Sequence, residues 1–235
     1  MTDGHNKYDG HRWWQGGIMG IKERKERERE QRRSIIIDAA ERVFFDNGVE
    51  NSSMNEVADA AELSKGTLYL YFSSKDDIFH GIIFRALTLL KEMFKEVRSK
   101  NDSGGEKLFK IGKAYMNFFY KYPNYFNAML HQEKIDIDIE IPDNSYLSKC
   151  SKVGDEIFSI IGDTISEGIE DGTLRSDLDP IKHSLALWGQ VTGVLQIVSS
   201  KGAVLKKMTG KSSGDLIEYT FEMIRRCSTN MDKNS

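Results

Sequence analysis

Apolar residues recur at intervals of three to four positions along most of the chain, which is the spacing of one face of an α-helix. The first face of this kind consists of Ile36, Ala39, Ala40, Val43 and Phe44. Asn47-Gly48 follows it, and this pair tolerates the left-handed conformation found at helix C-termini. The pattern therefore predicts a helix that ends at Asn47.

Two short helices are predicted after this point. Ser53 and Glu56 have the spacing of a capping box, in which each side chain satisfies a free backbone amide at the start of a helix. After the tight turn at residues 62–64, Ser64 can cap a second short helix over residues 65–71. Two short helices joined by a short turn are typical of a helix-turn-helix.

Longer helices are predicted beyond these. One begins after Ser73 or Ser74 and reaches about Ser99, with Asp76 and Asp77 in its first turn, where the helix dipole favours acidic groups. The further predicted helices cover residues 108–122, a short segment from Pro123, residues 146–171, a segment from Asp179-Pro180 through 198, and residues 213–227. Residues 134–143 alternate apolar and acidic side chains, which indicates an extended segment. The fold class predicted is all-α.

Composition sets limits on the class of protein. The chain has 235 residues and a formal net charge of -3, so a DNA-binding role would need a local basic patch. No secretory signal or apolar run of membrane-spanning length is evident, and Cys150 and Cys227 cannot build a disulfide framework. We therefore expect a cytoplasmic protein with no membrane association.

The N-terminal segment has two parts. Residues 1–21 are interpreted as a disordered or non-native N-terminal extension, and residues 1–18 can also be an extension upstream of a start at Met19. Residues 22–33 contain seven Lys/Arg and four Glu with strong helix propensity. This charged run can be a solvated helix face or a DNA-binding arm, and residues 1–75 as a whole hold 12 Lys/Arg against 13 Asp/Glu.

The segment from Ile36 to Phe79 resembles the tetracycline-repressor (TetR) and AcrR family of transcription regulators. The resemblance rests on Ala39-Ala40, Phe44, Gly48, the serine-rich cap before the second helix, Val57-Ala58, the run Leu63-Ser64-Lys65-Gly66-Thr67-Leu68-Tyr69, Tyr71-Phe72 and Lys75. Leu70 departs from the pattern, because many members carry a second tyrosine there. The resemblance implies a DNA-binding domain over 22–78 and a helical ligand-binding and dimerisation domain over 79–235.

In this resemblance the second short helix enters the major groove of a double-stranded DNA operator. Gly66 would let the backbone approach the bases, and Lys65, Thr67 and Tyr69 would contact bases or phosphates. Residues near helix N-termini are candidates for phosphate contacts, and the serines among them can also serve as caps alone. The complete set of predicted DNA-binding residues is Ser52, Ser53, Ser64, Lys65, Gly66, Thr67, Tyr69, Tyr71 and Lys75.

The C-terminal region suggests a ligand pocket and a dimer interface. The aromatic cluster is either plain core or one wall of an apolar pocket, formed by Tyr115, Phe118, Phe119, Tyr122, Phe126 and Met129 together with Trp188. The helix over 181–198 is apolar nearly all round, so it is either central in a monomer or buried against a second subunit. The predicted homodimer interface comprises Leu187, Val191, Val194, Val198, Ile217, Phe221 and Ile224.

Catalytic chemistry is not supported by any motif. Asp77 and His80 have the spacing of one carboxylate-histidine metal pair, but a di-iron bundle needs two such pairs and two more carboxylates. His131, Glu133 and the acids at 136, 138 and 140 could bind a cation, although a solvated acidic segment explains them as well. No cofactor or metal is predicted, and we expect a protein that is not an enzyme.

We therefore predict a DNA-binding transcription regulator, a repressor released from a palindromic operator by a small apolar or amphipathic ligand. The alternative is a ligand-binding or scaffold protein that uses its helix-turn-helix for protein contacts. The effector, the operator sequence and the regulated genes are not encoded in any motif.

Overall fold

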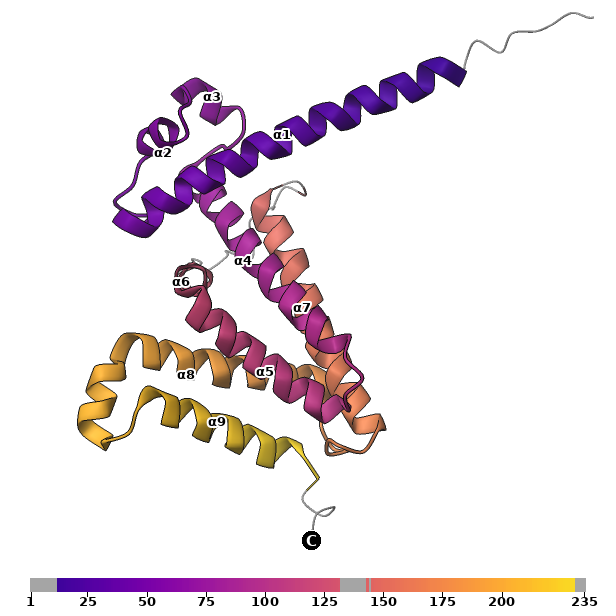
Figure 1. The fold of residues 1–235 in the computed structure, drawn as a ribbon, viewed down its shortest axis with the longest axis vertical. Coiled ribbons are helices and arrows are strands. Elements are labelled where there is room, and N and C mark those ends of the chain that lie inside the picture. Colours follow the sequence, from indigo (N-terminus) through magenta and orange to yellow (C-terminus); the bar gives the residue numbers. More distant parts are fainter. Residues whose placement is uncertain (1–11, 132–142, 144, 231–235) are drawn as a thin grey trace, which may run out of the picture. The chain divides into compact units, whose positions relative to one another are not determined.

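The computed structural model describes residues 12–131, 143 and 145–230, with side chains from residue 20 onward. All regular structure within these residues is α-helical, apart from one isolated bridge between Leu174 and Thr229 (Figure 1). The predicted all-α fold class is confirmed. None of the described helices is both long and apolar enough to cross a membrane. The chain divides into two compact units, one up to Phe79 and one from His80.

The first unit contains α1 (Arg12–Asn47), α2 (Met54–Ala60), α3 (Lys65–Tyr69) and the first turn of α4 (Lys75–Arg98). Its core is formed by Ile36, Ala39, Ala40 and Phe44 of α1 with Val57, Ala58, Leu68 and Phe72. The predicted end of the first helix is confirmed, since α1 stops at Asn47 and Gly48 has a φ of 82°.

The second unit contains the rest of α4 and five further helices. These are α5 (Gly104–Lys121), α6 (Pro123–Leu130), α7 (Tyr146–Glu170), α8 (Pro180–Thr209) and α9 (Ser213–Ser228). Pro123 and Pro180 stand at the first helical positions, as predicted. In Figure 1, α8 and α9 form an antiparallel pair beside α5.

Close packing of α5 against α7 holds the second unit together. A Cβ atom on Gly104 would lie 2.1 Å from the backbone nitrogen of Gly168, so the two helices approach to a distance that only glycine permits at this point. Next to this contact, the Lys107 ammonium is 2.5 Å from the Glu167 carboxylate. The loop after α7 caps α5, because the Asp171 carboxylate accepts a hydrogen bond from the Gly104 amide at 2.7 Å.

Three boundaries differ from those predicted. Helix α1 already includes residues 12–21, which the sequence analysis assigns to a disordered or non-native extension. Helix α5 begins at Gly104, because Ser103 and Glu106 form a capping box that the glycine pair concealed in the sequence. Helix α8 continues to Thr209 and ends at Gly210, with a φ of 70°. The predicted extended segment 134–143 lies outside the described residues except for Asp143.

Candidate functional site

Helices α2 and α3 form a helix-turn-helix whose turn is fixed by local hydrogen bonds. The Ser53 hydroxyl and Glu56 carboxylate form the predicted capping box of α2, with the carboxylate 2.7 Å from the Ser53 amide. In the turn, Glu62 adopts a left-handed φ of 56°, and the Leu63 amide donates to the Ala58 carbonyl at 2.9 Å. The turn therefore directs α3 away from α2 without using glycine.

Helix α3 exposes the side expected to contact DNA. Leu68 is fully buried, whereas Lys65 and Gly66 are exposed and Tyr69 is 47% exposed. An added Cβ on Gly66 would meet only the Ser64 hydroxyl oxygen, at 3.9 Å, so space is open above this residue. An exposed cation and a phenol on one side of a short helix can donate to base edges and phosphates.

Ser64 begins α3 as predicted. Its hydroxyl oxygen accepts a hydrogen bond from the Thr67 amide at 3.1 Å and lies 2.8 Å from the Thr67 hydroxyl oxygen. Both hydroxyls thus serve the cap, and Thr67 is half-buried. Tyr71 is also half-buried, one residue beyond the exposed Leu70.

Two predicted phosphate contacts have structural roles instead. Ser52 is only 6% exposed, and its hydroxyl donates to the Gly48 carbonyl at 2.7 Å. Its side chain is thus directed inward, away from solvent. The Lys75 ammonium donates to the carbonyls of Glu50 and Ser52, at 3.2 and 3.1 Å. Lys75 therefore fastens the loop before α2 to the start of α4, which residue spacing alone did not reveal.

An apolar cavity of about 330 Å³ lies inside the second unit. Six helices contribute to its wall. Representative lining residues are Ile83, Leu87 and Leu90 of α4, Leu108, Ile111 and Tyr115 of α5, Met129 of α6, Gly154, Ile157 and Phe158 of α7, Leu187, Trp188 and Val191 of α8, and Phe221 and Ile224 of α9. Arg225, Ser228 and Thr229 provide polar groups at its boundary. A space of this size and character suits an apolar ligand with a polar end.

The predicted pocket residues divide into two groups. Tyr115, Met129 and Trp188 line the cavity. Phe118, Phe119, Tyr122 and Phe126 instead pack on each other, with Phe119 and Phe126 ring centroids 4.9 Å apart, and contribute to the core. The prediction overlooked α4 and α7, which supply much of the lining. An apolar stripe on a helix shows that this face is buried, but it does not show whether the face packs against another helix or borders a cavity.

Polar atoms in the cavity wall are already paired. The Tyr115 and Thr192 hydroxyl oxygens are 3.1 Å apart, and burial raises the pKa of Tyr115 despite the lowering effect of hydrogen bonds to Thr192 and Trp188. The Cys150 thiol donates to the His80 carbonyl with a sulfur-oxygen distance of 3.3 Å. Burial raises the pKa of this thiol to about 12, so it remains protonated near neutrality.

Helices α8 and α9 expose an apolar surface on the side away from the core. Residues two positions apart on a helix point in nearly opposite directions. In α8, Gly193 lies between the buried Val191 and Leu195, so it faces away from the core. In α9, Tyr219 lies in the same way between the buried Ile217 and Phe221. We call this surface the outer face, formed by Gly189, Gly193, Ile197 and Val204 of α8 with Tyr219 and Met223 of α9.

The residues predicted for the dimer interface are not on this outer face. Val191, Val198, Ile217 and Phe221 belong to the core of their own chain, and Leu187, Val194 and Ile224 pack against it. The four core residues are thus not available to a second subunit in this structure, whereas Leu187, Val194 and Ile224 are half-buried. Both sides of these two helices are rich in apolar or small residues, so periodicity could not distinguish them.

Candidate metal ligands do not assemble in the described part of the chain. No group of three His, Cys, Asp or Glu side chains is close enough there to hold an ion. The Asp77 carboxylate accepts a hydrogen bond from the Ser73 amide at 3.1 Å, while the Ser74 hydroxyl caps the Asp77 amide. Asp77 therefore helps to begin α4. Apart from His131, the candidate cation ligands around 133–140 lie outside the described residues.

Comparison with known proteins agrees with this geometry. Residues 36–82 match the family model of bacterial regulatory proteins of the TetR family. The transcriptional repressor KstR2 of Mycolicibacterium smegmatis is 24% identical over 148 residues, which cover 63% of this chain and 70% of KstR2. The regulator AcrR of Shigella flexneri is 24% identical over 217 residues, which cover 86% of this chain and 93% of AcrR.

A solved structure shares the fold over nearly its whole length. The transcriptional regulator FadR from Bacillus subtilis, crystallised with stearoyl-CoA, superposes with a TM-score of 0.63 at 20% identity, covering 83% of this chain and 98% of FadR. The helix-turn-helix and helical second unit define a DNA-binding transcription regulator. Residues 36–82 thus match the TetR family, and over most of its length the chain is similar to the regulator AcrR.

Proposed function

We propose that this protein is a repressor that binds a palindromic operator as a homodimer and releases it when an apolar or amphipathic ligand fills the cavity of the second unit. The observation that carries the proposal is the course of α4. This helix begins at Lys75 in the DNA-binding unit and supplies Ile83, Leu87 and Leu90 to the cavity wall. The proposed domain limits, 22–78 for DNA binding and 79–235 for ligand binding and dimerisation, place the boundary within this helix.

The DNA-reading part of the proposal rests on α3. Lys65, Gly66 and Tyr69 form its exposed side, and Ser53 and Ser64 stand exposed at helix N-termini, where backbone amides favour phosphates. Thr67 and Tyr71 are half-buried and add to this side. Ser52 and Lys75 support the surface from behind and are not proposed as direct contacts.

The release mechanism requires that the ligand favour one conformation over another. Operator binding needs two recognition helices spaced by about 34 Å, the repeat of successive major grooves. A ligand packed against α4 can shift this spacing only to the extent that it binds the released conformation more tightly. Helix α4 is continuous across the unit boundary. A displacement of its cavity-lining turns would therefore move Lys75, which holds the loop before α2.

Stearoyl-CoA is the first ligand to test, because the similar fold of FadR was crystallised with it. We expect stearoyl-CoA to raise the thermal midpoint and to release the protein from duplex DNA that it selects from a random library. Leu87→Trp should fill the cavity and abolish both ligand effects while leaving DNA binding intact. Ligand binding without any change in DNA affinity would refute the coupling.

Dimerisation is proposed to use the outer face of α8 and α9. Gly189 and Gly193 have open space above them, which permits close approach of a second helix, and Ile197 is 45% exposed beside them. Ile197→Asp should therefore yield a monomer by sedimentation at micromolar concentration. Ile181→Asp is the matched control, because Ile181 is 74% exposed on another side of α8. A wild-type monomer would contradict the proposal.

The alternative function, a scaffold that uses the helix-turn-helix for protein contacts, makes a different prediction. A scaffold would select no duplex from a random library. The exposed Lys65 ammonium, for which no acidic partner is found among the described residues, favours the DNA-binding proposal.

A further inference from the structure

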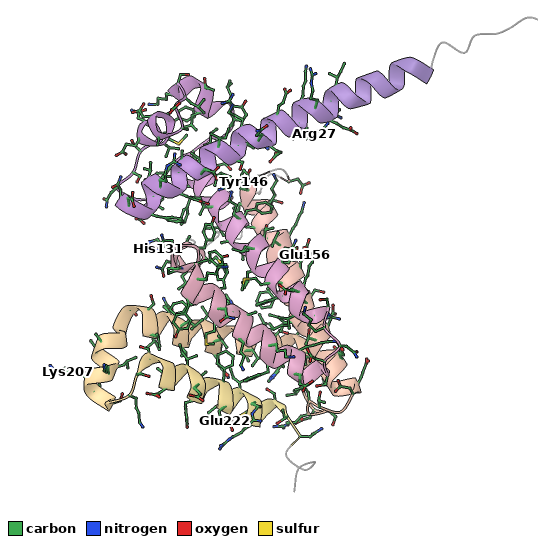
Figure 2. All side chains as sticks on the ribbon, viewed as in Figure 1. Arg27, His131, Tyr146, Glu156, Lys207 and Glu222 are labelled. Atoms are coloured by element: carbon green, nitrogen blue, oxygen red, sulfur yellow. The ribbon has the colours of Figure 1, made fainter. Side chains whose placement is uncertain are left out.

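The polar groups at one end of the cavity are already committed to partners in the protein. The Ser228 hydroxyl donates to the Ile224 carbonyl at 2.8 Å, and the Thr229 hydroxyl donates to the Arg225 carbonyl at 3.0 Å. The exposed Arg225 guanidinium lies 2.9 Å from the carboxylate of Glu222, the residue labelled on α9 in Figure 2. A ligand therefore gains neither a free hydroxyl donor nor an uncompensated charge from these groups.

A pair of buried hydroxyl groups between α5 and α8 has one hydrogen to spare. The Tyr115 and Thr192 hydroxyl oxygens are 3.1 Å apart, and the two residues are only 7% and 9% exposed. The pair carries two hydrogens, whereas the hydrogen bond between the oxygens uses one of them. No acceptor for the second hydrogen is found among the residues that the structure describes. A buried donor without an acceptor is costly, so an acceptor on a ligand would be stabilised here.

Trp188 indicates which of the two hydroxyls keeps its hydrogen for a ligand. The indole N–H can only donate, and it forms a hydrogen bond to the Tyr115 hydroxyl. The Tyr115 oxygen therefore already accepts one bond, and the Thr192 hydroxyl can donate another. Tyr115 and Trp188 both line the cavity, whereas Thr192 is not among its lining residues. The Tyr115 hydroxyl is thus the group of this pair that a ligand can reach.

The surroundings of the Tyr115 hydroxyl favour a neutral acceptor. The Tyr115 ring centroid lies 6.5 Å from that of Phe94 and 5.9 Å from that of Phe126. Burial raises the pKa of Tyr115, so the phenol keeps its hydrogen near neutrality. Arg225 is the one charged side chain among the described residues that line the cavity, and its partner is Glu222. An ionised ligand group would lose its hydration here without a counter-charge, whereas a ketone, lactone or ether oxygen loses far less.

We propose that Tyr115 is a specificity-determining residue, which donates its hydroxyl hydrogen to a neutral acceptor, such as a ketone oxygen, within the apolar body of the ligand. In this arrangement Thr192 and Trp188 donate to the Tyr115 oxygen, which leaves the Tyr115 hydrogen for the ligand. The inference rests on the proposed function, because it names the chemistry of a ligand in the cavity of the second unit. The cavity thereby distinguishes a ring ketone from a hydrocarbon of the same shape.

The test uses two probes that differ in one oxygen atom. Tetralin is a bicyclic hydrocarbon, and α-tetralone has the same ring system with a ketone oxygen. Dissociation constants for both are measured by isothermal titration calorimetry with the wild type, Tyr115→Phe, Thr192→Val and Tyr122→Phe. Tyr122→Phe is the matched control, because it removes the same hydroxyl group from a side chain that is not among the cavity-lining residues. Thermal melting checks that every variant is folded.

The wild type should prefer α-tetralone to tetralin more strongly than Tyr115→Phe does. We expect the ratio of the two dissociation constants to change by about tenfold in Tyr115→Phe, which is equivalent to about 1.4 kcal/mol for the lost hydrogen bond. Comparing ratios cancels the cost of removing the ketone from water, because this cost is common to both proteins. Tyr122→Phe should keep the wild-type ratio, and Thr192→Val should keep most of the preference, since the Tyr115 hydrogen remains.

An unchanged ratio in Tyr115→Phe would overturn the inference. A preference that disappears only in Thr192→Val would also overturn it, because Thr192 would then be the donor. A wild type that binds neither probe contradicts it as well. Stearoyl-CoA is titrated in parallel to separate these failures from that of the proposed function. A protein that binds stearoyl-CoA without the expected effect of Tyr115→Phe on the ratio loses this inference alone, whereas one that binds none of the three compounds loses both.

Discussion

The two units hold their functional residues by different means. In the helix-turn-helix, hydrogen bonds between residues three or four apart fix each short helix, as Ser53 with Glu56 and Ser64 with Thr67 show. In the second unit, contacts across more than sixty residues create the cavity. Tyr115 meets Thr192, and Gly104 meets Gly168. The proposed DNA-reading surface is thus a local property of the chain, whereas the cavity is a property of how helices pack.

This difference suits the proposed control of DNA binding by a ligand. The helix-turn-helix keeps its shape when the second unit rearranges, because the capping hydrogen bonds of α2 and α3 involve no residue beyond position 79. A cavity lined by six helices can change volume through small shifts of several of them. The comparison predicts that substitutions at packing contacts change stability strongly, and that substitutions on α3 change DNA affinity without affecting stability.

Gly104→Ala should have the largest effect. The added methyl would lie 2.1 Å from the backbone of Gly168, which cannot move aside as a flexible side chain can. We expect a loss of about 3 kcal/mol in the free energy of unfolding, measured by denaturant titration. Gly162→Ala is the control, because its methyl meets only the Ser184 hydroxyl oxygen at 3.8 Å and helix propensity improves. Similar stability of both variants would show that packing here is loose.

Lys65→Ala and Tyr69→Ala should each weaken operator binding by about 1–3 kcal/mol. Both side chains are exposed on α3, so their loss leaves no cavity and no unpaired buried group. Fluorescence anisotropy on the selected duplex gives the affinity, and thermal melting should be unchanged. If neither variant alters the affinity, α3 does not enter the groove.

Tyr115→Phe should cost about 1 kcal/mol in the free energy of unfolding, because the buried Thr192 hydroxyl loses its partner at 3.1 Å. Thr192→Val should cost less in the Tyr115→Phe background than in the wild type. Such a double-mutant cycle measures the coupling across the cavity wall. Additive costs would indicate that the two hydroxyls do not interact.

Glu62→Gly should have the smallest effect, a stabilisation of about 0.5 kcal/mol. The residue has a left-handed φ of 56°, where glycine has no Cβ penalty but loses more chain entropy on folding. Glu62→Gln retains the strain and separates it from the change of charge. A destabilised glycine variant would mean that the Glu62 side chain supports the turn.

The helix-turn-helix and most helix boundaries could be predicted from local sequence signals. Ser53, Ser64, Pro123 and Pro180 act on backbone groups within one turn of themselves, so their effect can be read from neighbouring residues. The family resemblance indicated Lys65, Gly66 and Tyr69, and the structure places all three on the exposed side of α3. The prediction failed at Ser52 and Lys75, whose hydrogen bonds join segments that are brought together only by folding.

Whether an apolar residue faces the core, the cavity or the outer face depends on how the helices pack. Helical periodicity shows that a face is apolar, but it does not show what lies opposite. Phe118 and Phe126 therefore belong to the core while Tyr115 lines the cavity, and Ile217 is buried while Tyr219 is exposed. The physical reason is that burial depends on neighbours distant in sequence, whose approach is set by contacts such as that of Gly104 with Gly168.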